Sequence, residues 1–131
     1  MRTPSEARVR LARLGEAAAA EELGRRGYTI LERNYHCRGG EADIVATAVS
    51  AGEGECLIFV EVKTRSELRH GLPQDAVGWT KRQRLGAAAI HYCHHHEVEN
   101  VPVRFDVVEV VMLRGEIAAV EVIPDAFTPD V

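Results

Sequence analysis

The chain has 131 residues, of which 46% are hydrophobic and 27% are charged, and its formal net charge is −4. This length allows one domain with a real core and is too short for two, so we expect a single domain over residues 1–131. No apolar run approaches the length of a membrane span, and the N-terminus lacks the apolar centre of a signal peptide. We therefore expect no membrane partner.

The cysteines are three in number and have neither metal-ligand nor CxxC spacing: Cys37, Cys56 and Cys93. An odd number without such spacing predicts reduced thiols and a cytoplasmic location.

A net negative charge disfavours a nucleic-acid partner, but the charge is unevenly distributed. Residues 1–84 contain 14 Lys and Arg against 12 Asp and Glu, a balance of +2, whereas residues 85–131 contain 2 against 8, a balance of −6. We expect the basic residues between Lys63 and Arg84 to border any nucleic-acid site, with a solvated charged face as the alternative. The charge distribution is therefore compatible with a nucleic-acid partner but is not evidence for one.

The first predicted element is a helix. Thr3 is placed to cap it, Pro4 to occupy its first position and Glu6 to close a capping box. An alanine-rich stretch follows to about Arg26, and Gly27 is typical of the position just beyond a helix.

Three strands are predicted next, over 28–36, 41–48 and 56–63, with turns at 38–40 and 50–54. A second helix is predicted over 75–95, and strands over 103–113 and 117–123 complete the chain. The order α-β-β-β-α-β-β predicts an α/β domain with a mixed central sheet flanked by helices.

The third strand carries charged residues in an unusual place. Alternation divides it into two rows, one of Ile58, Val60 and Val62 and the other of Leu57, Phe59, Glu61 and Lys63. Apolar residues on both faces are typical of a central strand covered on both sides. Burying an unpaired charge there costs several kcal/mol, so Glu61 and Lys63 require partners.

The second strand repeats this pattern. Glu41 and Asp43 are expected to share a face with Val45, while the opposite face carries Ala42, Ile44 and Ala46. If the two strands form a hairpin, Asp43 can lie beside Glu61. Adjacent carboxylates repel unless one is protonated or a divalent cation lies between them, and oxygen ligands suit Mg²⁺ or Mn²⁺.

The first helix adds another acid, because Glu16 falls at helical spacing with the small residues Ala12, Ala19 and Ala20. The alternative to a metal site is a structural ion network of Asp43, Glu61 and Lys63 near the end of the sheet.

Two stretches, GEADIVA at 40–46 and FVEVKTR at 59–65, resemble the YraN-type family of small bacterial proteins. The resemblance covers nearly the whole chain and includes Gly15-Glu16, Arg33-Asn34, Lys81, Arg104-Phe105-Asp106 and Ala126-Phe127. That family in turn resembles archaeal Holliday-junction resolvases and the PD-(D/E)xK nuclease superfamily. The resemblance thus implies a restriction-endonuclease-like, resolvase-like fold.

The resemblance also implies roles for individual residues. Asp43 matches the bridging metal ligand, Glu61 the second carboxylate and Lys63 the catalytic lysine, and the Val62 backbone carbonyl is expected to complete the metal site. Glu16 matches the acid of the first helix. The departure from the pattern is Ala42, which stands where the literal PD motif has proline. We keep Glu41 as a possible additional acid of the site.

The implied function is metal-dependent hydrolysis of phosphodiester bonds in DNA, including branched DNA, with a non-catalytic nucleic-acid-binding module as the alternative. The expected phosphate contacts are Arg65, Lys81 and Arg82, against plain solvation of the same side chains. A homodimer would suit symmetric cleavage of a junction.

Two further features stand outside this site. His91 and His95 lie one helical turn apart, a spacing that can bind zinc, although histidines also favour a helix C-terminus because of the helix dipole. Asp106 is expected to be structural and to pair with Arg104 or with a residue of a helix.

Overall fold

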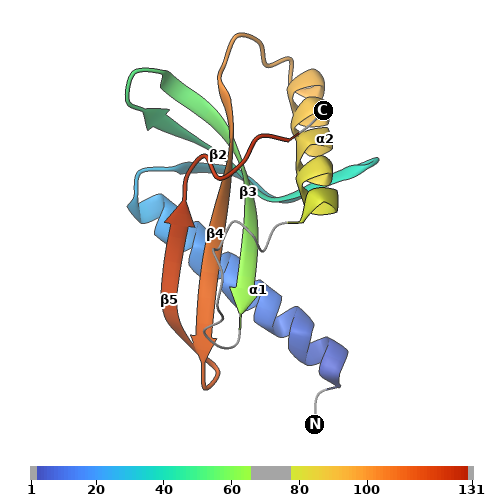
Figure 1. The fold of residues 1–131 in the computed structure, drawn as a ribbon, viewed down its shortest axis with the longest axis vertical. Coiled ribbons are helices and arrows are strands. Elements are labelled where there is room, and N and C mark those ends of the chain that lie inside the picture. The colour runs from blue at the N-terminus through green and yellow to red at the C-terminus, as the bar shows by residue number, and fades with distance from the viewer. Residues whose placement is uncertain (1–2, 66–77, 130–131) are drawn as a thin grey trace.

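The structure is a computed structural model that describes residues 3–65 and 78–129. Its elements are α1 (Pro4–Arg25), β1 (Thr29–Cys37), β2 (Gly40–Ser50), β3 (Gly54–Arg65), α2 (Trp79–His95), β4 (Val103–Leu113) and β5 (Glu116–Ile123) (Figure 1). This order confirms the predicted α/β class. The helix predicted from Asp75 begins at Trp79, after Gly78 at the N-cap, and Asp75 itself lies outside the described residues.

The first helix begins as the sequence predicts. The Thr3 hydroxyl accepts a hydrogen bond from the Glu6 backbone N–H, and the Glu6 carboxylate accepts one from the Thr3 N–H, both at 3.2 Å. These two bonds satisfy donors that a helix start otherwise leaves free. Gly27, at φ +95, takes the left-handed conformation that lets the chain leave the helix.

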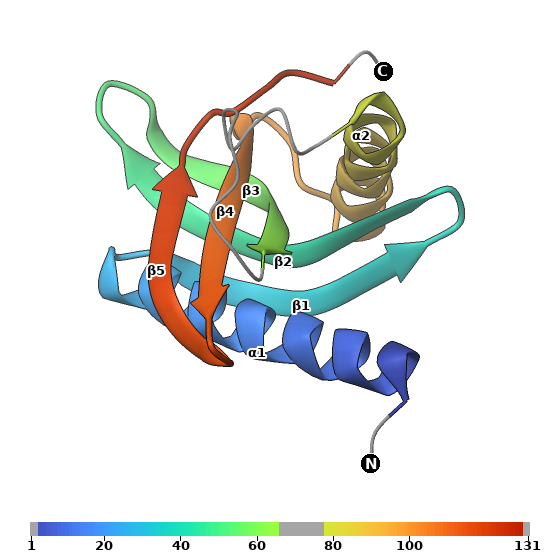
Figure 2. The same cartoon turned by 60° about the horizontal axis from the view of Figure 1, so that its bottom comes forward.

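The sheet is mixed, with the order β1-β2-β3-β4-β5. Among the strands of the described residues, β3 and β4 are the one parallel pair, and the crossover between them contains α2; the other neighbours are antiparallel. Helix α1 lies along one face of the sheet and α2 lies on the other (Figures 1 and 2). Neither helix is long and apolar enough to cross a membrane.

Each helix closes one hydrophobic core. The core under α1 contains Ala19, Leu23, Ile44, Ala46, Cys56, Ile58, Val60, Val108, Val110 and Met112. The core under α2 contains Tyr35, Ala42, Val45, Leu57, Phe59, Leu85, Ala88, Ala89, Tyr92, Phe105, Val107 and Phe127. As predicted, β3 contributes an apolar row to both, because it is covered on both faces.

The predicted faces of β2 are wrong at one point. Ala42 packs under α2 together with Val45, whereas Ile44 packs under α1. Asn34, at φ 53, lies between the β1 residues that pair with Ile44 and Ala42. This left-handed residue interrupts the regular alternation of the β1–β2 hairpin, so the strand pair changes face there.

The hairpin tip packs closely on α2 at Gly40, and this contact yields a prediction. A Cβ atom on Gly40 would lie 2.6 Å from the Ala88 nitrogen and 2.7 Å from the Arg84 carbonyl oxygen, both backbone atoms of α2. We expect Gly40→Ala to lower the free energy of unfolding by about 1–3 kcal/mol, measured by denaturant titration, because the backbone must move.

Gly24→Ala is the matched control, because a Cβ atom at that helical position meets nothing within 4 Å. It should leave stability unchanged or raise it by up to about 1 kcal/mol. Equal stability of Gly40→Ala and the wild type would contradict the close packing of the hairpin on α2.

Candidate active site

The site begins where β2 separates from β3. Ile44 and Val60 are the last pair of the β2–β3 ladder, so Asp43 and Glu61 would be the next. Instead, the Asp43 carboxylate takes over the backbone pairing and accepts a hydrogen bond of 2.7 Å from the Val62 N–H. From Glu61 to Arg65 the ladder of β3 continues with β4, so its other edge is open in the described part of the chain.

A pocket lies at this open edge. It is lined by Arg8, Leu11, Ala12, Glu16, Asp43, Glu61, Val62, Lys63, Thr64 and Lys81. Three acids and three bases therefore meet here from α1, β2, β3 and α2. The structure brings together the four positions that the resemblance singled out, Glu16, Asp43, Glu61 and Lys63, from segments far apart in sequence.

The acids are close enough to perturb one another. Burial and the charge of Glu61 raise the pKa of Asp43 to about 7, against the opposing effect of the Val62 N–H. The charge of Glu16 raises this pKa further, and that of Lys81 lowers it. Asp43 thus gives up its proton near neutral pH, which is unusual for an aspartate and is typical of functional sites.

Glu61 has a partner that the sequence did not reveal. It is 4% exposed, and its Oε1 accepts a hydrogen bond of 2.7 Å from the Lys81 Nζ. This bond raises the pKa of Lys81, so the ammonium group stays charged. The sequence predicts Lys81 as a phosphate contact. In the structure its ammonium group is hydrogen-bonded to the Glu61 carboxylate.

The donor set fits a hard divalent cation. Asp43 and Glu61 offer carboxylate oxygens and Val62 a backbone carbonyl, and the described residues of the pocket lining include neither thiol nor imidazole. Mg²⁺ is commonly held by one or two carboxylates together with water. Within residues 3–65 and 78–129, no group of three or more His, Cys, Asp or Glu side chains is already gathered for a metal. In this structure Asp43 accepts a hydrogen bond from the Val62 N–H and Glu61 accepts one from Lys81.

Glu41, the possible additional acid, is not among the described residues that line the pocket. Its carboxylate lies 3.5 Å from the Arg84 Nε and 3.5 Å from the His36 Nδ1. The nearest charged partners of Glu41 thus lie outside the described pocket lining, although its charge, like that of Asp43, contributes to the raised pKa of Lys81.

Two of the predicted phosphate contacts also have protein neighbours. The Arg65 Nε lies 3.3 Å from Glu109 Oε1, with side chains only 14% and 13% exposed. The Arg82 guanidinium lies 5.2 Å from the centre of the Phe127 ring. Neither arginine lines the pocket as far as its described lining shows. No acid from residues 85–131 lines it either, so the acidic third of the chain does not surround the site.

The pocket also contains a base that sequence reasoning missed. Arg8 lines it from the first turns of α1. The pattern that could have revealed it is the spacing of four between Arg8, Ala12 and Glu16, which places all three along one side of the helix.

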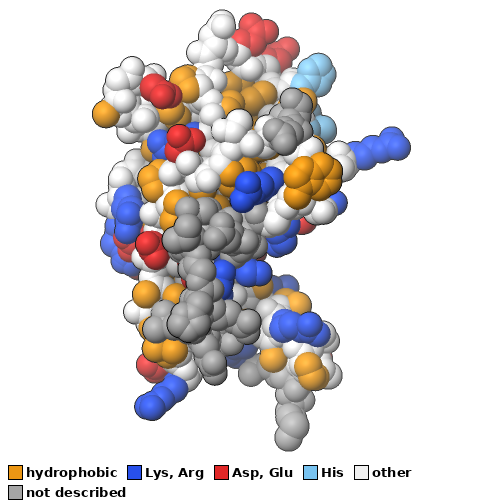
Figure 3. All heavy atoms as spheres, in the orientation of Figure 1, with side chains coloured by type: hydrophobic (Ala, Val, Ile, Leu, Met, Phe, Trp, Pro, Cys, Tyr) orange, Lys and Arg blue, Asp and Glu red, His pale blue; other side chains and the backbone are white. Residues whose placement is uncertain are grey.

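His91 and His95, the pair with zinc-binding spacing, lie elsewhere, in the last turns of α2. The Tyr35 hydroxyl and the His91 Nδ1 share a hydrogen bond, and the His91 and His95 rings stack with centres 6.0 Å apart. Figure 3 shows the histidines beside acidic side chains at the end of the molecule opposite the start of α1. The zinc-binding alternative for this pair stays a prediction.

Asp106 forms a separate buried network. It is fully buried and accepts hydrogen bonds from the Tyr28 hydroxyl at 2.7 Å, from two Arg104 nitrogens at 2.9 Å and from the Asp125 N–H at 2.9 Å. The pairing with Arg104 confirms the predicted partner. Burial raises the pKa of Tyr28 to about 12. The network lies outside the pocket lining and joins the start of β1 to β4.

This network predicts a large loss of stability for Asp106→Asn. Arg104 would lose the charge that neutralises it, and removing one partner of a buried pair costs about 3–5 kcal/mol. Denaturant titration measures this loss directly. A change below about 1 kcal/mol would mean that the network contributes little to the fold.

The fold and the site together define the structural class of this protein. The mixed five-stranded sheet between two helices is an α/β domain consistent with a resolvase-like fold. The chain belongs to the uncharacterised protein family UPF0102, whose model matches residues 15–110, and UPF0102 is the YraN family. The matched segment contains Glu16, Asp43, Glu61, Lys63 and Lys81.

Relatives match over most of their length. A UPF0102 protein of Moorella thermoacetica is 47% identical over 121 residues, which cover 92% of this chain and 97% of the relative. UPF0102 proteins of Syntrophus aciditrophicus and Trichlorobacter lovleyi are each 43% identical, over 119 and 114 residues. These matches cover 91% and 87% of this chain and 89% and 87% of the relatives.

Proposed function

We propose that this protein is a metal-dependent nuclease of the PD-(D/E)xK type that hydrolyses phosphodiester bonds in DNA, including branched DNA. The observation that carries the proposal is the pair of adjacent acids at the open edge of β3. Asp43 and Glu61 lie close enough for the charge of Glu61 to raise the pKa of Asp43. Lys63 lines the same pocket.

Asp43, Glu61 and the Val62 carbonyl would hold Mg²⁺ or Mn²⁺. When bound, this cation would supply a water of lowered pKa and polarise the scissile phosphate. The Val62 N–H fixes the direction of the Asp43 carboxylate, so this ligand is held in place before the substrate arrives. The ligands therefore come from two rigid strands.

The remaining charged groups of the pocket act on substrate and water. Lys63 orients the attacking water or offsets negative charge that develops on the phosphate in the transition state. Glu16, from α1, acts through a water molecule or helps to hold a second cation. Lys81 is the base nearest to the acids, and its ammonium group can turn from Glu61 to a phosphate oxygen once Glu61 binds a cation.

The setting suits a nucleic-acid partner despite the net charge. The bases of the pocket are Arg8, Lys63 and Lys81, while the acidic third of the chain contributes nothing to its described lining. A homodimer would place two such sites on a symmetric junction. The free thiols of Cys37, Cys56 and Cys93 fit a reducing cytoplasm, where DNA is present.

One observation favours the alternative, a non-catalytic nucleic-acid-binding module. The bond from Lys81 to Glu61 neutralises one acid of the pair without a metal. In that case the pocket would bind phosphates through Lys63 and Arg8 and the acid pair would be structural.

A cleavage assay on linear duplex, single-stranded and four-way DNA, in Mg²⁺, Mn²⁺ or EDTA, distinguishes the two functions. The proposal predicts cleavage of at least one substrate that depends on the metal and stops in EDTA. Binding without cleavage of any substrate would leave only the binding module. The absence of both binding and cleavage would contradict both functions.

A further inference from the structure

Helix α1 buries residues against the sheet only from Gly15 onward. Its 22 residues span roughly 33 Å. In its second half, Ala19 and Leu23 are fully buried against the sheet. Its N-terminal half, residues 4–14, is exposed apart from the half-buried Leu11. One side of the helix therefore continues from the core into solvent.

Arg8 lies on this same side. Steps of four or three residues lead from Leu23 through Ala19, Gly15 and Ala12 to Arg8, so these residues form one stripe. Gly15 is buried against Thr64, but Ala12 and Arg8 are exposed. An arginine thus continues the core-facing stripe beyond its last buried residue, Gly15.

This stripe places Arg8 at the candidate active site. Arg8 lines the pocket that also holds Glu16, Asp43 and Glu61. Among the described residues, its guanidinium forms no ion pair or hydrogen bond, so no structural partner accounts for it. By contrast, Arg25 and Arg26 at the other end of α1 pair with glutamates.

Resting on the proposed function, we infer that Arg8 binds a backbone phosphate of the DNA at a distance from the phosphate that is cleaved. Eight residues separate Arg8 from Glu16, about 12 Å along the helix axis. Duplex DNA carries a phosphate about every 3.4 Å of its axis on each strand. If a DNA strand runs along α1, the distance of about 12 Å between Arg8 and Glu16 therefore corresponds to three to four nucleotides. A guanidinium matches a phosphate with two parallel hydrogen bonds.

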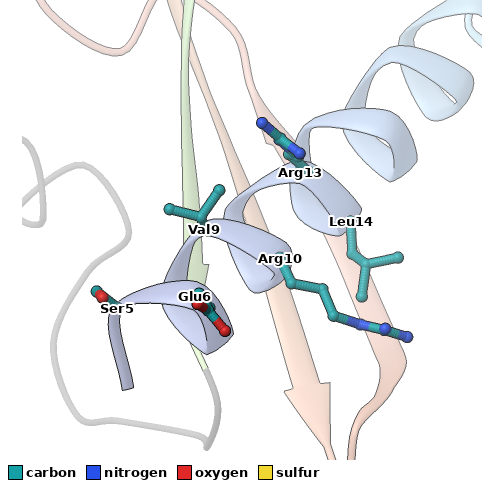
Figure 4. A pocket seen from close by; sticks show the side chains of 6 residues that line it. All are labelled: Ser5, Glu6, Val9, Arg10, Arg13 and Leu14. Carbon is teal, nitrogen blue, oxygen red and sulfur yellow. The ribbon is translucent and has the colours of Figure 1, made fainter. Parts of the chain in front are cut away.

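The same helix offers a matched control. Arg10 is also exposed, but it lies about 200° around the helix from Arg8. It lines a different hollow of α1 with Arg13, Val9 and Leu14, seen in Figure 4. A general attraction of DNA to the basic helix would involve Arg10 as much as Arg8, whereas a site contact involves Arg8 alone.

The test is fluorescence anisotropy with labelled duplex and four-way DNA at several salt concentrations in EDTA, where no cleavage occurs. Arg8→Ala should weaken binding by about 10-fold and lower the slope of log affinity against log salt by about 0.9, while Arg10→Ala changes affinity less than about twofold. Arg8→Lys should restore the slope and only part of the affinity. Melting temperatures of all variants should match the wild type.

The outcomes separate the two proposals. If the wild type binds DNA and Arg8→Ala binds it equally well, this inference alone is overturned. The same holds if Arg8→Ala and Arg10→Ala weaken binding equally. A wild type that binds neither DNA would overturn the proposed function and this inference with it.

Discussion

Lys63→Ala should abolish DNA cleavage while leaving the protein folded and able to bind DNA. Lys63 lines the pocket beside the acid pair, and loss of a group that stabilises charge in the transition state costs about 100- to 1000-fold in kcat. The structure also explains why stability should be spared. Glu61 is paired with Lys81, so removing Lys63 leaves this buried acid with its partner.

Single-turnover cleavage, DNA affinity and the melting temperature together measure this effect. Lys81→Ala is the matched control for stability, because it deprives Glu61 of its partner and should lower the free energy of unfolding by about 1 kcal/mol or more. Undiminished cleavage by Lys63→Ala would remove the lysine from the mechanism. A loss of about 3–5 kcal/mol in stability would instead favour a structural ion network that includes Lys63.

Asp43→Asn should stabilise the metal-free protein at alkaline pH and destroy its response to metal. The pKa of Asp43 is about 7 in the folded protein against an ordinary 3.8, so the folded state binds this proton more tightly than the unfolded state. Folding therefore disfavours the charged form of Asp43, which lowers the stability of the protein. This loss of stability is complete above pH 7 and declines as the pH falls from 7 toward 3.8. An asparagine carries no charge but can still accept the Val62 N–H.

We expect the variant to gain about 1–3 kcal/mol over the wild type at pH 8 in EDTA, with the gain shrinking as pH falls through 7 toward 3.8. At 100 times its dissociation constant, Mg²⁺ should raise the free energy of unfolding of the wild type by about 2.7 kcal/mol, and with it the melting temperature. It should leave Asp43→Asn unchanged. Denaturant and thermal unfolding across pH measure both effects.

Asp106→Asn is the contrasting control, since it also replaces a buried aspartate but removes the charge that neutralises Arg104. It should destabilise the protein with or without Mg²⁺. A loss of stability in Asp43→Asn at pH 8 comparable to that in Asp106→Asn would identify Asp43 as a structural acid.

The order of elements and the acid pair could be predicted because both depend on local pattern. Alternation along β3 marks Glu61 as a charge in an apolar row, and the same argument on β2 singles out Asp43. The capping box at Thr3 and Glu6 is likewise local. Such features require only the pleat of a strand or the pitch of a helix.

What the sequence did not predict depends on tertiary contacts. The partner of Glu61 is Lys81, 20 residues away on α2, rather than a neighbour on the same strand. The change of face in β2 depends on Asn34 in the facing strand, which no pattern within β2 reveals. Arg8 lines the site from the exposed half of α1, and helix pitch alone does not show where the burial of a helix ends.

The proposed function requires that Asp43 and Glu61 form a binding site for a divalent cation. Calorimetric titration of Mn²⁺ or Mg²⁺ into the wild-type protein near pH 7 tests it most directly. We expect saturable binding at this acid pair, with release of the proton that Asp43 holds near this pH, so that the heat depends on the ionisation enthalpy of the buffer. A titration without saturable heat in any buffer would contradict it.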